Sequence, residues 1–325
     1  MIIVTGSAGF IGFHLIRKLL EQGEEVVGID NINDYYDVEL KRARLDILEK
    51  EPNFIFYKAD ISKPNDISQI FKKHSNARVI VHLAAQAGVR YSLDNPFAYV
   101  ESNLTGQVSI FENAKIHLKD LEHLVYASSS SVYGNNEKTP SSVEDRTDSP
   151  VSLYAATKKS GEMIANYYAS TFKIPATGLR FFTVYGPYGR PDMAYFSFTK
   201  DILEGKTIKL FNHGNLQRDF TFVDDIISGV IAVINKKPVG ATPHQIYNLG
   251  NNKPVELKYF VETLEKLLGK KAMLENVEMQ KGDVYKTYAD IERSSRELGF
   301  KPVTSIEKGL ESFVSWYKAY YKISV

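Results

Sequence analysis

Two rhythms of hydrophobic and polar residues alternate along the first half of the chain. Short apolar runs are separated by longer stretches in which apolar residues recur every three or four positions. The short runs predict strands at Ile2–Val4, Val26–Ile29, Phe54–Tyr57, Val79–Leu83 and Leu124–Ala127. The longer stretches predict helices at Gly9–Glu21, Asp37–Lys50, Asp66–His74, Phe97–His117 and Leu153–Phe172. Alternating strands and helices predict an α/β fold with a doubly wound parallel sheet, a Rossmann fold.

The pattern changes in the second half of the chain. Ala176–Phe182 predicts a sixth strand, and the glycines and prolines of 186–191 then mark irregular backbone. Further strands are expected at Ile208–Phe211 and Gln245–Leu249, with helices near Asp224–Asn235, Val255–Leu268 and Ile306–Tyr320. We expect a nucleotide-binding Rossmann domain at 1–182 and a smaller mixed α/β substrate-binding cap at 183–325. Part of 220–250 is expected to return to the first domain.

Composition narrows the possible functions. The chain has 325 residues, 43% of them hydrophobic, a formal net charge of +1 and no cysteine. A charge near zero gives no basic surface for nucleic acid or membrane. The absence of cysteine excludes disulfides and thiolate chemistry, and no metal site is expected. The first strand starts at the second residue, which leaves no room for a signal peptide, and a cytoplasmic protein is expected.

A glycine-rich turn follows the first predicted strand. Gly6, Gly9 and Gly12 have the spacing G-x-x-G-x-x-G at the start of the first helix, where backbone amides favour a pyrophosphate. Asp30 ends the second strand, 18 residues after Gly12. A carboxylate there accepts hydrogen bonds from a ribose diol and repels a 2′-phosphate, which favours NAD over NADP. The alternative is a purely structural turn.

Other residues at the strand ends are candidate cofactor contacts. Asp60 follows the third strand and could reach the adenine, and small residues follow the fourth strand. Each of these is weak evidence by itself, because loop residues of these types are common. The predicted cofactor-binding set is Gly6, Gly9, Phe10, Ile11, Gly12, Asp30, Asn31, Asp60, Ile61, Leu83, Ala84, Ala85, Tyr154 and Lys158.

Tyr154 and Lys158 are the candidate catalytic pair. Their spacing of four places both side chains on one face of a helix. An ordinary tyrosine has a pKa near ~10 and is a poor base at neutral pH, but a nearby cation favours the phenolate. A surface Tyr/Lys pair is the alternative. The serine cluster Ser128–Ser131, about 25 residues upstream, favours the catalytic interpretation.

Together these motifs resemble the extended short-chain dehydrogenase/reductase family, nearly from end to end. The resemblance rests on the glycine turn, Asp30, Leu83–Ala85, Ser128–Gly134, Tyr154 with Lys158, and Leu179–Pro187. It implies tightly bound, recycled NAD and a nucleotide-sugar substrate. It also implies that Tyr154 is the base, that Lys158 holds the nicotinamide ribose and lowers the tyrosine pKa, and that Ser129 hydrogen-bonds the reacting hydroxyl.

The serine cluster discriminates among the reactions of this family. Sugar-nucleotide dehydratases resembling this chain carry an Asp-Glu pair after the catalytic hydroxyl residue, and UDP-glucuronate decarboxylases carry a glutamate two residues after it. Ser130 and Ser131 stand at those positions here. Neither serine can act as an ordinary acid or base near neutral pH. Oxidation and reduction at one carbon, as in an epimerase, is therefore favoured.

Three further stretches narrow the range of expected substrates. Residues 183–194, Val89–Ser92 and Asn33–Asp37 are similar to those of UDP-uronate 4-epimerases. Arg190 can clasp a C6 carboxylate with paired hydrogen bonds. A loop arginine that binds phosphate or solvent is the alternative, and Arg218 could form a sheet-edge salt bridge instead of binding phosphate. The predicted substrate-binding set is Arg90, Ser130, Ser131, Thr183, Arg190 and Arg218.

The resemblance therefore implies interconversion of UDP-glucuronate and UDP-galacturonate by oxidation at C4, rotation of the 4-keto intermediate and re-reduction. Epimerisation of UDP-glucose or a UDP-N-acetylhexosamine, and decarboxylation of UDP-glucuronate, remain alternatives. Lys281-Gly282-Asp283 replaces the family's Pro-Gly-Asp and leaves the diphosphate contacts there open. The helices Phe97–His117 and Leu153–Phe172 carry apolar residues beyond one face, and the resemblance implies that they pair into a four-helix bundle of a homodimer, with packing inside one subunit as the alternative.

Overall fold

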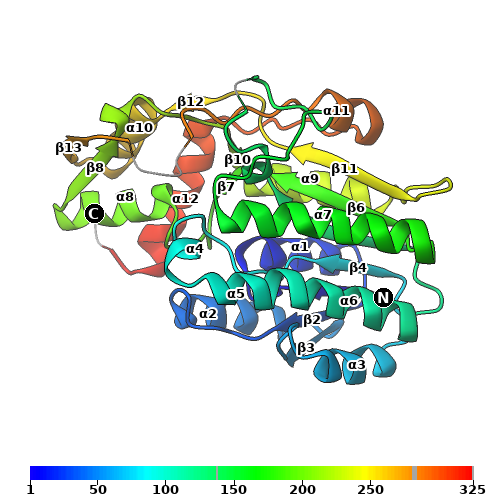
Figure 1. Cartoon of the computed structure of the whole chain (residues 1–325). Helices are drawn as coiled ribbons and strands as arrows, with labels where there is room; N and C mark the ends of the chain where they lie inside the picture. Colours follow the sequence, from blue (N-terminus) through cyan, green and yellow to red (C-terminus); the bar gives the residue numbers. More distant parts are fainter. Residues whose placement is uncertain (137, 280–283, 324–325) are drawn as a thin grey trace.

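A seven-stranded parallel sheet forms the centre of the molecule (Figure 1). The computed structural model describes residues 1–136, 138–279 and 284–323. The strand order is β11-β6-β5-β4-β1-β2-β3. The strands are β1 Ile2–Thr5, β2 Val26–Asp30, β3 Phe54–Lys58, β4 Val79–His82, β5 His123–Ser129, β6 Ala176–Phe181 and β11 His244–Leu249.

Helices cover both faces of this sheet because side chains alternate between the faces along each strand. In β1, Ile2 and Val4 belong to the hydrophobic cluster under one set of helices, while Ile3 belongs to the cluster on the opposite face. The first set is α1 Phe10–Glu21, α2 Val38–Leu48 and α9 Val223–Ile234. The second is α3 Pro64–Lys73, α6 Gly106–His117 and α7 Leu153–Phe172. The predicted doubly wound Rossmann fold is confirmed.

The strand order reverses beside β1, which pairs with β2 on one side and β4 on the other. In open parallel sheets, loops diverge at such a reversal and leave a crevice at the carboxyl ends of the strands. The glycine turn follows β1 at this point, so the topology places it at the mouth of the crevice.

The helix predicted at Phe97–His117 is present, but it is not α-helical throughout. The run consists of α5 Pro96–Tyr99, a π-helical turn at Val100–Thr105 and α6, with helical backbone at both junctions, and the short helix α4 Tyr91–Asp94 precedes it. The extra residue of a π turn rotates the side chains that follow and is common at functional sites. Here the turn contains Asn103. Its side-chain amide accepts a hydrogen bond from the Gln86 amide and donates to the Gln86 carbonyl oxygen and, at 3.0 Å, to the Thr157 hydroxyl. Apolar spacing alone could not reveal this π turn.

The cap consists of small sheets and helices at the carboxyl end of the main sheet (Figure 1). Its strands are β7 Thr183–Tyr185, β8 Thr207–Phe211, β9 Gln217–Arg218, β10 Phe220–Phe222, β12 Val255–Glu256 and β13 Met273–Val277. Its helices are α8 Ala194–Glu204, α10 Leu257–Leu268 and α12 Ile306–Tyr320, whereas α11 Glu292–Leu298 packs on β11 and α9. The helix predicted at Val255–Leu268 loses its first two residues to strand pairing with β9.

The chain returns to the first lobe after entering the cap. α9 packs on α1, and β11 pairs with β6 as the edge strand of the main sheet. α8, α11 and β13 were not predicted. α11 and β13 have only seven and five residues, too few for a clear apolar period, whereas α8 was missed although its buried residues have helical spacing. Within the described ranges, the helices fall short of the length and apolarity that crossing a membrane requires.

Candidate active site

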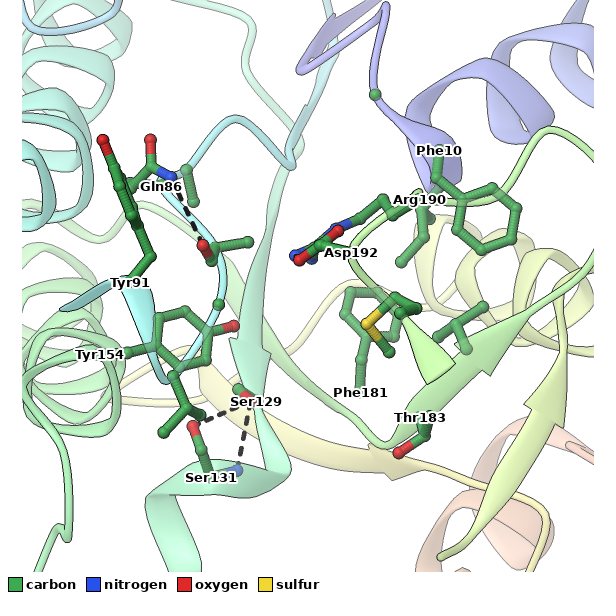
Figure 2. Close-up of a pocket in the computed structure, with 18 of the residues that line it drawn as sticks. Phe10, Gln86, Tyr91, Ser129, Ser131, Tyr154, Phe181, Thr183, Arg190 and Asp192 are labelled. Atoms are coloured by element: carbon green, nitrogen blue, oxygen red, sulfur yellow. Dashed lines mark hydrogen bonds and ion pairs between the residues drawn. The ribbon is translucent and has the colours of Figure 1, made fainter. Parts of the chain in front are cut away.

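A cavity of about 880 Å³ lies at the carboxyl ends of the parallel strands, between the sheet and the cap. Figure 2 shows Tyr154, Ser129 and Ser131 on one side of it, with Arg190 and Asp192 pointing in from the opposite side. Every candidate residue named from the sequence lines this cavity except Asp60. Residues separated by more than 200 positions in the chain are therefore brought to one site.

The glycine turn packs tightly against the end of β4. Gly6 has φ +74°, and a Cβ there would approach the Ala84 nitrogen to 2.8 Å. A Cβ on Gly12 would collide with the Gly6 carbonyl oxygen. The N-cap of α1 is Gly9, whose lack of a side chain leaves the first amides of the helix open to an anionic ligand. The turn thus has the shape and polarity that a pyrophosphate requires.

Asp30 also lines the cavity. Its carboxylate accepts the Ala8 amide at 3.0 Å and the Ile32 amide at 2.8 Å. Asp60 does not line the cavity; it accepts from the Asn31 side chain at 3.1 Å, and Asn31 itself lines the wall. A role for Asp60 in contacting the cofactor therefore stays a prediction, and any effect would act through Asn31.

Tyr154 projects from the first turn of α7 into the cavity. This helix begins at Ser152, whose hydroxyl caps the Ala155 amide at 3.1 Å. Burial raises the pKa of Tyr154, and a hydrogen bond from Ser129 opposes this rise. The lowering of the tyrosine pKa that we expected from Lys158 is not found in the free protein, because desolvation of the phenolate outweighs the nearby charges.

Lys158 lies one turn further along α7 and is 8% exposed. Its ammonium donates to the Ala127 carbonyl oxygen at 2.9 Å and lies 6.0 Å from the centre of the Tyr154 ring. Burial lowers the pKa of Lys158 to about 8. The protein therefore holds a cation beside the cavity where solvent cannot stabilise it well.

Lys158→Met is expected to stabilise the dinucleotide-free protein. Folding lowers the pKa of Lys158 from its ordinary 10.5 to about 8, a difference equivalent to about 3 kcal/mol. The cost of holding the proton is fully present below pH 8 and disappears as pH rises through 10.5. Losing the bond to the Ala127 carbonyl offsets about 1 kcal/mol. Thermal unfolding should show a higher Tm for the variant at pH 7 and a shrinking advantage toward pH 10.

An equal or lower Tm at pH 7 would contradict this prediction. Lys159→Met, on the next position of the same helix, is the matched control. Lys159 is half-buried rather than enclosed, and its ammonium lies 3.5 Å from Glu162. Its removal should leave the pH dependence of stability nearly unchanged.

A buried ion pair supports the strand that carries the serines. Arg180 on β6 donates to both carboxylate oxygens of Glu162 on α7, at 2.7 and 2.9 Å. The Ser128 hydroxyl donates to the same carboxylate at 2.7 Å. Since the charges are paired and hydrogen-bonded, the cluster joins β5, β6 and α7 directly behind Ser129. Ser129 in turn accepts from the Ser131 hydroxyl at 2.9 Å.

Arg190 reaches the cavity from the loop that follows β7. Its Nε donates to Asp192 at 3.0 Å and its Nη2 at 2.5 Å, while the Tyr35 hydroxyl donates to the same carboxylate at 3.1 Å. Burial disfavours the Asp192 carboxylate, but the charge of Arg190 and the hydrogen bonds from Arg190 and Tyr35 together outweigh burial and hold the pKa of Asp192 below its ordinary value. A bidentate carboxylate site is thus already formed in the cavity.

Arg44 holds this loop from behind. The side chain is fully buried on α2, and it donates to the carbonyl oxygens of Ala8 and Tyr188 at 2.7 Å and of Gly189 at 3.2 Å. Tyr188 has φ +54°, a strained conformation for a residue other than glycine. One buried guanidinium therefore joins the glycine turn to the segment that carries Arg190.

The other predicted substrate residues surround the same space. Ser130, Ser131 and Thr183 line the cavity. Arg90 lies over the ring of Phe211 at 5.1 Å, and Arg218 donates to the carbonyl oxygens of Gln217 and Tyr285. The Lys281-Gly282-Asp283 segment lies outside the described residues.

Sequence reasoning missed Arg44, Asp192 and Tyr35. Tyr35 and Asp192 fell inside stretches recognised by resemblance, but no chemical role was assigned to them. In the sequence, Arg44 cannot be told from an ordinary exposed helix residue such as Arg42, which lies two positions earlier and is exposed. A signal was present only for Tyr35 and Asp192, as polar residues within the recognised stretches.

Comparisons with known proteins agree with this geometry. A family model described as "NAD dependent epimerase/dehydratase family" matches residues 2–250. The CapI protein of Staphylococcus aureus is 49% identical, covering 99% of both chains. UDP-glucuronate 4-epimerase 4 of Arabidopsis thaliana is 48% identical over 98% of this chain and 76% of its own length.

A solved structure shows the same architecture. UDP-glucuronic acid 4-epimerase of Bacillus cereus, in complex with UDP-glucuronic acid and NAD, superposes with a TM-score of 0.91 at 36% identity. The match covers 98% of this chain and 99% of that one. With the glycine turn, the Tyr154/Lys158 pair and a family match over most of its length, this chain belongs to the NAD dependent epimerase/dehydratase family.

Proposed function

We propose that this protein is an NAD-dependent UDP-glucuronate 4-epimerase that interconverts UDP-glucuronate and UDP-galacturonate. The observation that carries the proposal is the position of Arg190. Its guanidinium enters the cavity opposite Tyr154 and Ser129, and it already binds a carboxylate in bidentate geometry. A hexose with an acid group at C6 matches that chemistry better than a neutral hexose.

The residues at the strand ends fit NAD. The Gly6 turn admits a pyrophosphate without a Cβ in the way, and Asp30 offers a carboxylate where a ribose diol would lie. When bound, NAD takes a hydride from C4 of the sugar and returns it to the opposite face. Lys158 would bond the nicotinamide ribose, and the small residues Ala84 and Ala85 leave room beside it.

Tyr154 is the proposed base. Its phenolate removes the proton from O4 as the C4–O4 bond becomes a carbonyl, and it returns the proton at the end of the cycle. Ser129, which hydrogen-bonds Tyr154, holds the O4 hydroxyl in line. Since burial raises the pKa of the free Tyr154, its ionisation depends on added positive charge nearby, and the oxidised cofactor supplies one.

The sugar must turn over between the two half-reactions. The 4-keto intermediate swings about its bond to the diphosphate and presents its other face to the same base. The intermediate is a β-keto acid, because its carbonyl lies two carbons from the carboxylate. Such acids lose CO₂ most readily when the C5–C6 bond is perpendicular to the carbonyl plane. Arg190, with the Ser130, Ser131 and Thr183 hydroxyls, is proposed to hold the carboxylate away from that arrangement.

The residues that line the cavity disfavour the two rival reactions, dehydration and decarboxylation. Dehydration and decarboxylation in related enzymes use carboxyl groups where this chain has Ser130 and Ser131. Asp192 is a carboxyl within the cavity, but Arg190 keeps its pKa low and both its oxygens accept hydrogen bonds. It is therefore poorly suited to deliver a proton near neutral pH.

Proton NMR of UDP-glucuronate incubated with the purified protein, without added cofactor, tests the proposal. UDP-galacturonate should appear, which would establish 4-epimerisation and retained NAD together. A UDP-pentose product would overturn the proposal in favour of decarboxylation. If no change follows even after NAD is added, the same assay with UDP-glucose and UDP-N-acetyl sugars tests the remaining alternatives.

We further propose that residues 1–182, with returning parts of 220–250, bind the dinucleotide and that 183–325 bind the nucleotide sugar.

We also propose that the protein is a homodimer. Figure 1 shows α7 beside α5 and α6, and large apolar side chains are exposed along both segments. These are Leu93, Phe97, Val100, Val108, Ile116, Met163, Tyr167 and Phe172, with Phe97 78% and Met163 65% exposed. Pairing of two copies into a four-helix bundle would cover them.

Met163→Glu is expected to weaken the dimer by about 30-fold or more, because it buries a charge at the centre of the proposed bundle. Light scattering across a dilution series would measure the dissociation. Val303→Glu is the control, since Val303 is 75% exposed on the cap and far from these helices in the chain. A variant Met163→Glu that stays dimeric with unchanged affinity would place the interface elsewhere.

A further inference from the structure

We propose that Asp192 is an intramolecular stand-in for the carboxylate of the sugar. It holds the Arg190 guanidinium in the free enzyme, releases it when the uronate binds, and takes it back while the 4-keto ring turns over. The inference rests on the proposed function and adds a residue to it that acts through Arg190. Asp192 is therefore a positioning residue rather than a catalytic one.

The geometry of the pair is that of a ligand and its site. Both Asp192 oxygens meet Arg190 along the Nε/Nη2 edge, at 3.0 and 2.5 Å. This is the planar, two-bond arrangement in which arginine recognises any carboxylate. Both side chains line the cavity, and they are only 22% and 31% exposed. Figure 2 shows the pair extending into the space that faces Tyr154.

The charges favour replacement of Asp192 by the uronate carboxylate on Arg190 over binding of both carboxylates at once. Arg190 is the cation that acts on Asp192, and the Asp192 carboxylate already neutralises it. A second carboxylate on the same guanidinium would lie beside the first in a largely enclosed space, where like charges repel strongly. The uronate and Asp192 therefore compete for one partner. Asp192 cannot move far from Arg190 when it is displaced, because only one residue separates the two in the chain.

Tyr35 gives Asp192 a place to remain after the exchange. Its hydroxyl donates to the Asp192 Oδ2 at 3.1 Å from a loop 157 residues away in the chain. Burial and the Asp192 charge raise the pKa of Tyr35 to about 12, so the phenol keeps its proton. The ring packs 4.9 Å from that of Tyr91. Tyr35 thus lowers the cost of leaving Asp192 without its arginine.

The exchange has a consequence for turnover. The carboxylate of the intermediate must leave Arg190 when the ring swings and must return afterwards. If Asp192 takes its place during the swing, Arg190 is never left buried without a counter-charge. Removing the Asp192 charge should therefore make the uronate bind more tightly and leave more slowly. Binding and turnover should change in opposite senses, which loss of an ordinary support would not produce.

Asp192→Asn tests this, since the side chain keeps its shape and loses its charge. Calorimetry in a Tyr154→Phe background would measure binding without turnover. We expect UDP-glucuronate to bind about tenfold more tightly, while the affinity for UDP stays the same. In the protein with Tyr154 intact, KM and kcat for UDP-glucuronate should both fall. Tyr35→Phe should act in the opposite direction, weakening UDP-glucuronate relative to UDP.

Weaker binding of UDP-glucuronate by Asp192→Asn would overturn the exchange and identify Asp192 as a fixed support of Arg190. Unchanged binding would overturn it as well, while leaving the proposed function intact. If the Tyr154→Phe parent binds UDP-glucuronate no better than UDP, the proposed function and the exchange both fail. Equal affinity for UDP across the variants shows that each is folded.

Discussion

Tyr154→Phe is expected to lower the rate of UDP-glucuronate epimerisation by about 10²–10⁴-fold, the usual contribution of a general base. The substitution removes the group that takes the O4 proton and leaves the ring in place. The ring lies 6.0 Å from that of Tyr99, an edge-to-face contact that phenylalanine keeps. Progress curves followed by proton NMR would measure the loss. The dinucleotide content of the purified variant should match that of the parent.

Tyr167→Phe is the matched control for this prediction. It removes a hydroxyl from the same helix, at a position that is 54% exposed and does not line the cavity. Its rate should equal that of the parent. A Tyr154→Phe variant that retains most of its activity would disprove the role of Tyr154 as the base. Loss of bound dinucleotide in the variant would instead indicate a role in cofactor binding.

Arg190→Ala is expected to lower kcat/KM for UDP-glucuronate by about 10–100-fold, since hydrogen bonds to charged groups are each worth about 1.5–3 kcal/mol. The carboxylate of the 4-keto intermediate would also lose its clamp. A larger share of turnovers should then end in loss of CO₂ and formation of a UDP-4-keto-pentose. Proton NMR resolves the epimer from the pentose, and released CO₂ can be measured independently.

Two further variants separate the causes of that loss. In Arg190→Ala, Asp192 loses its positively charged partner, and its carboxylate would repel that of the substrate. The double variant Arg190→Ala/Asp192→Asn removes this repulsion, and it should recover binding without recovering the protection against CO₂ loss. Arg190→Lys keeps the charge but not the paired bonds, and it should give intermediate leakage. Full activity of Arg190→Ala with no pentose would refute the clamp.

Much of the fold was predictable from local pattern. The strands of the main sheet and the helices Leu153–Phe172 and Ile306–Tyr320 appear as predicted, since strong apolar periods decide such elements. The predicted helix Phe97–His117 is present as well, but the π turn inside it was not predictable. The π turn there is stabilised by bonds between Asn103, Gln86 and Thr157, which are far apart in the chain.

The candidate site was predictable where chemistry depends on local spacing. Gly6, Gly9 and Gly12 must be close in sequence to form one turn, and Tyr154 and Lys158 must share a helical face. The direction of the Tyr154 pKa could not be read in this way, because it depends on how deeply the fold buries the phenol. Asp60 shows the reverse case: it follows β3 as expected, but it accepts a hydrogen bond from Asn31 and does not line the cavity.

The sequence by itself determined the parallel sheet, the dinucleotide turn and the set of reactive side chains, because short-range pattern and residue type suffice for each. Only the tertiary structure decided how these groups are joined. Arg44 ties the glycine turn to the Arg190 loop through backbone carbonyl oxygens, which any residue could offer. Asp192 and Tyr35 meet across 157 positions of the chain. Such contacts follow from packing of distant elements, and no local pattern of residues encodes them.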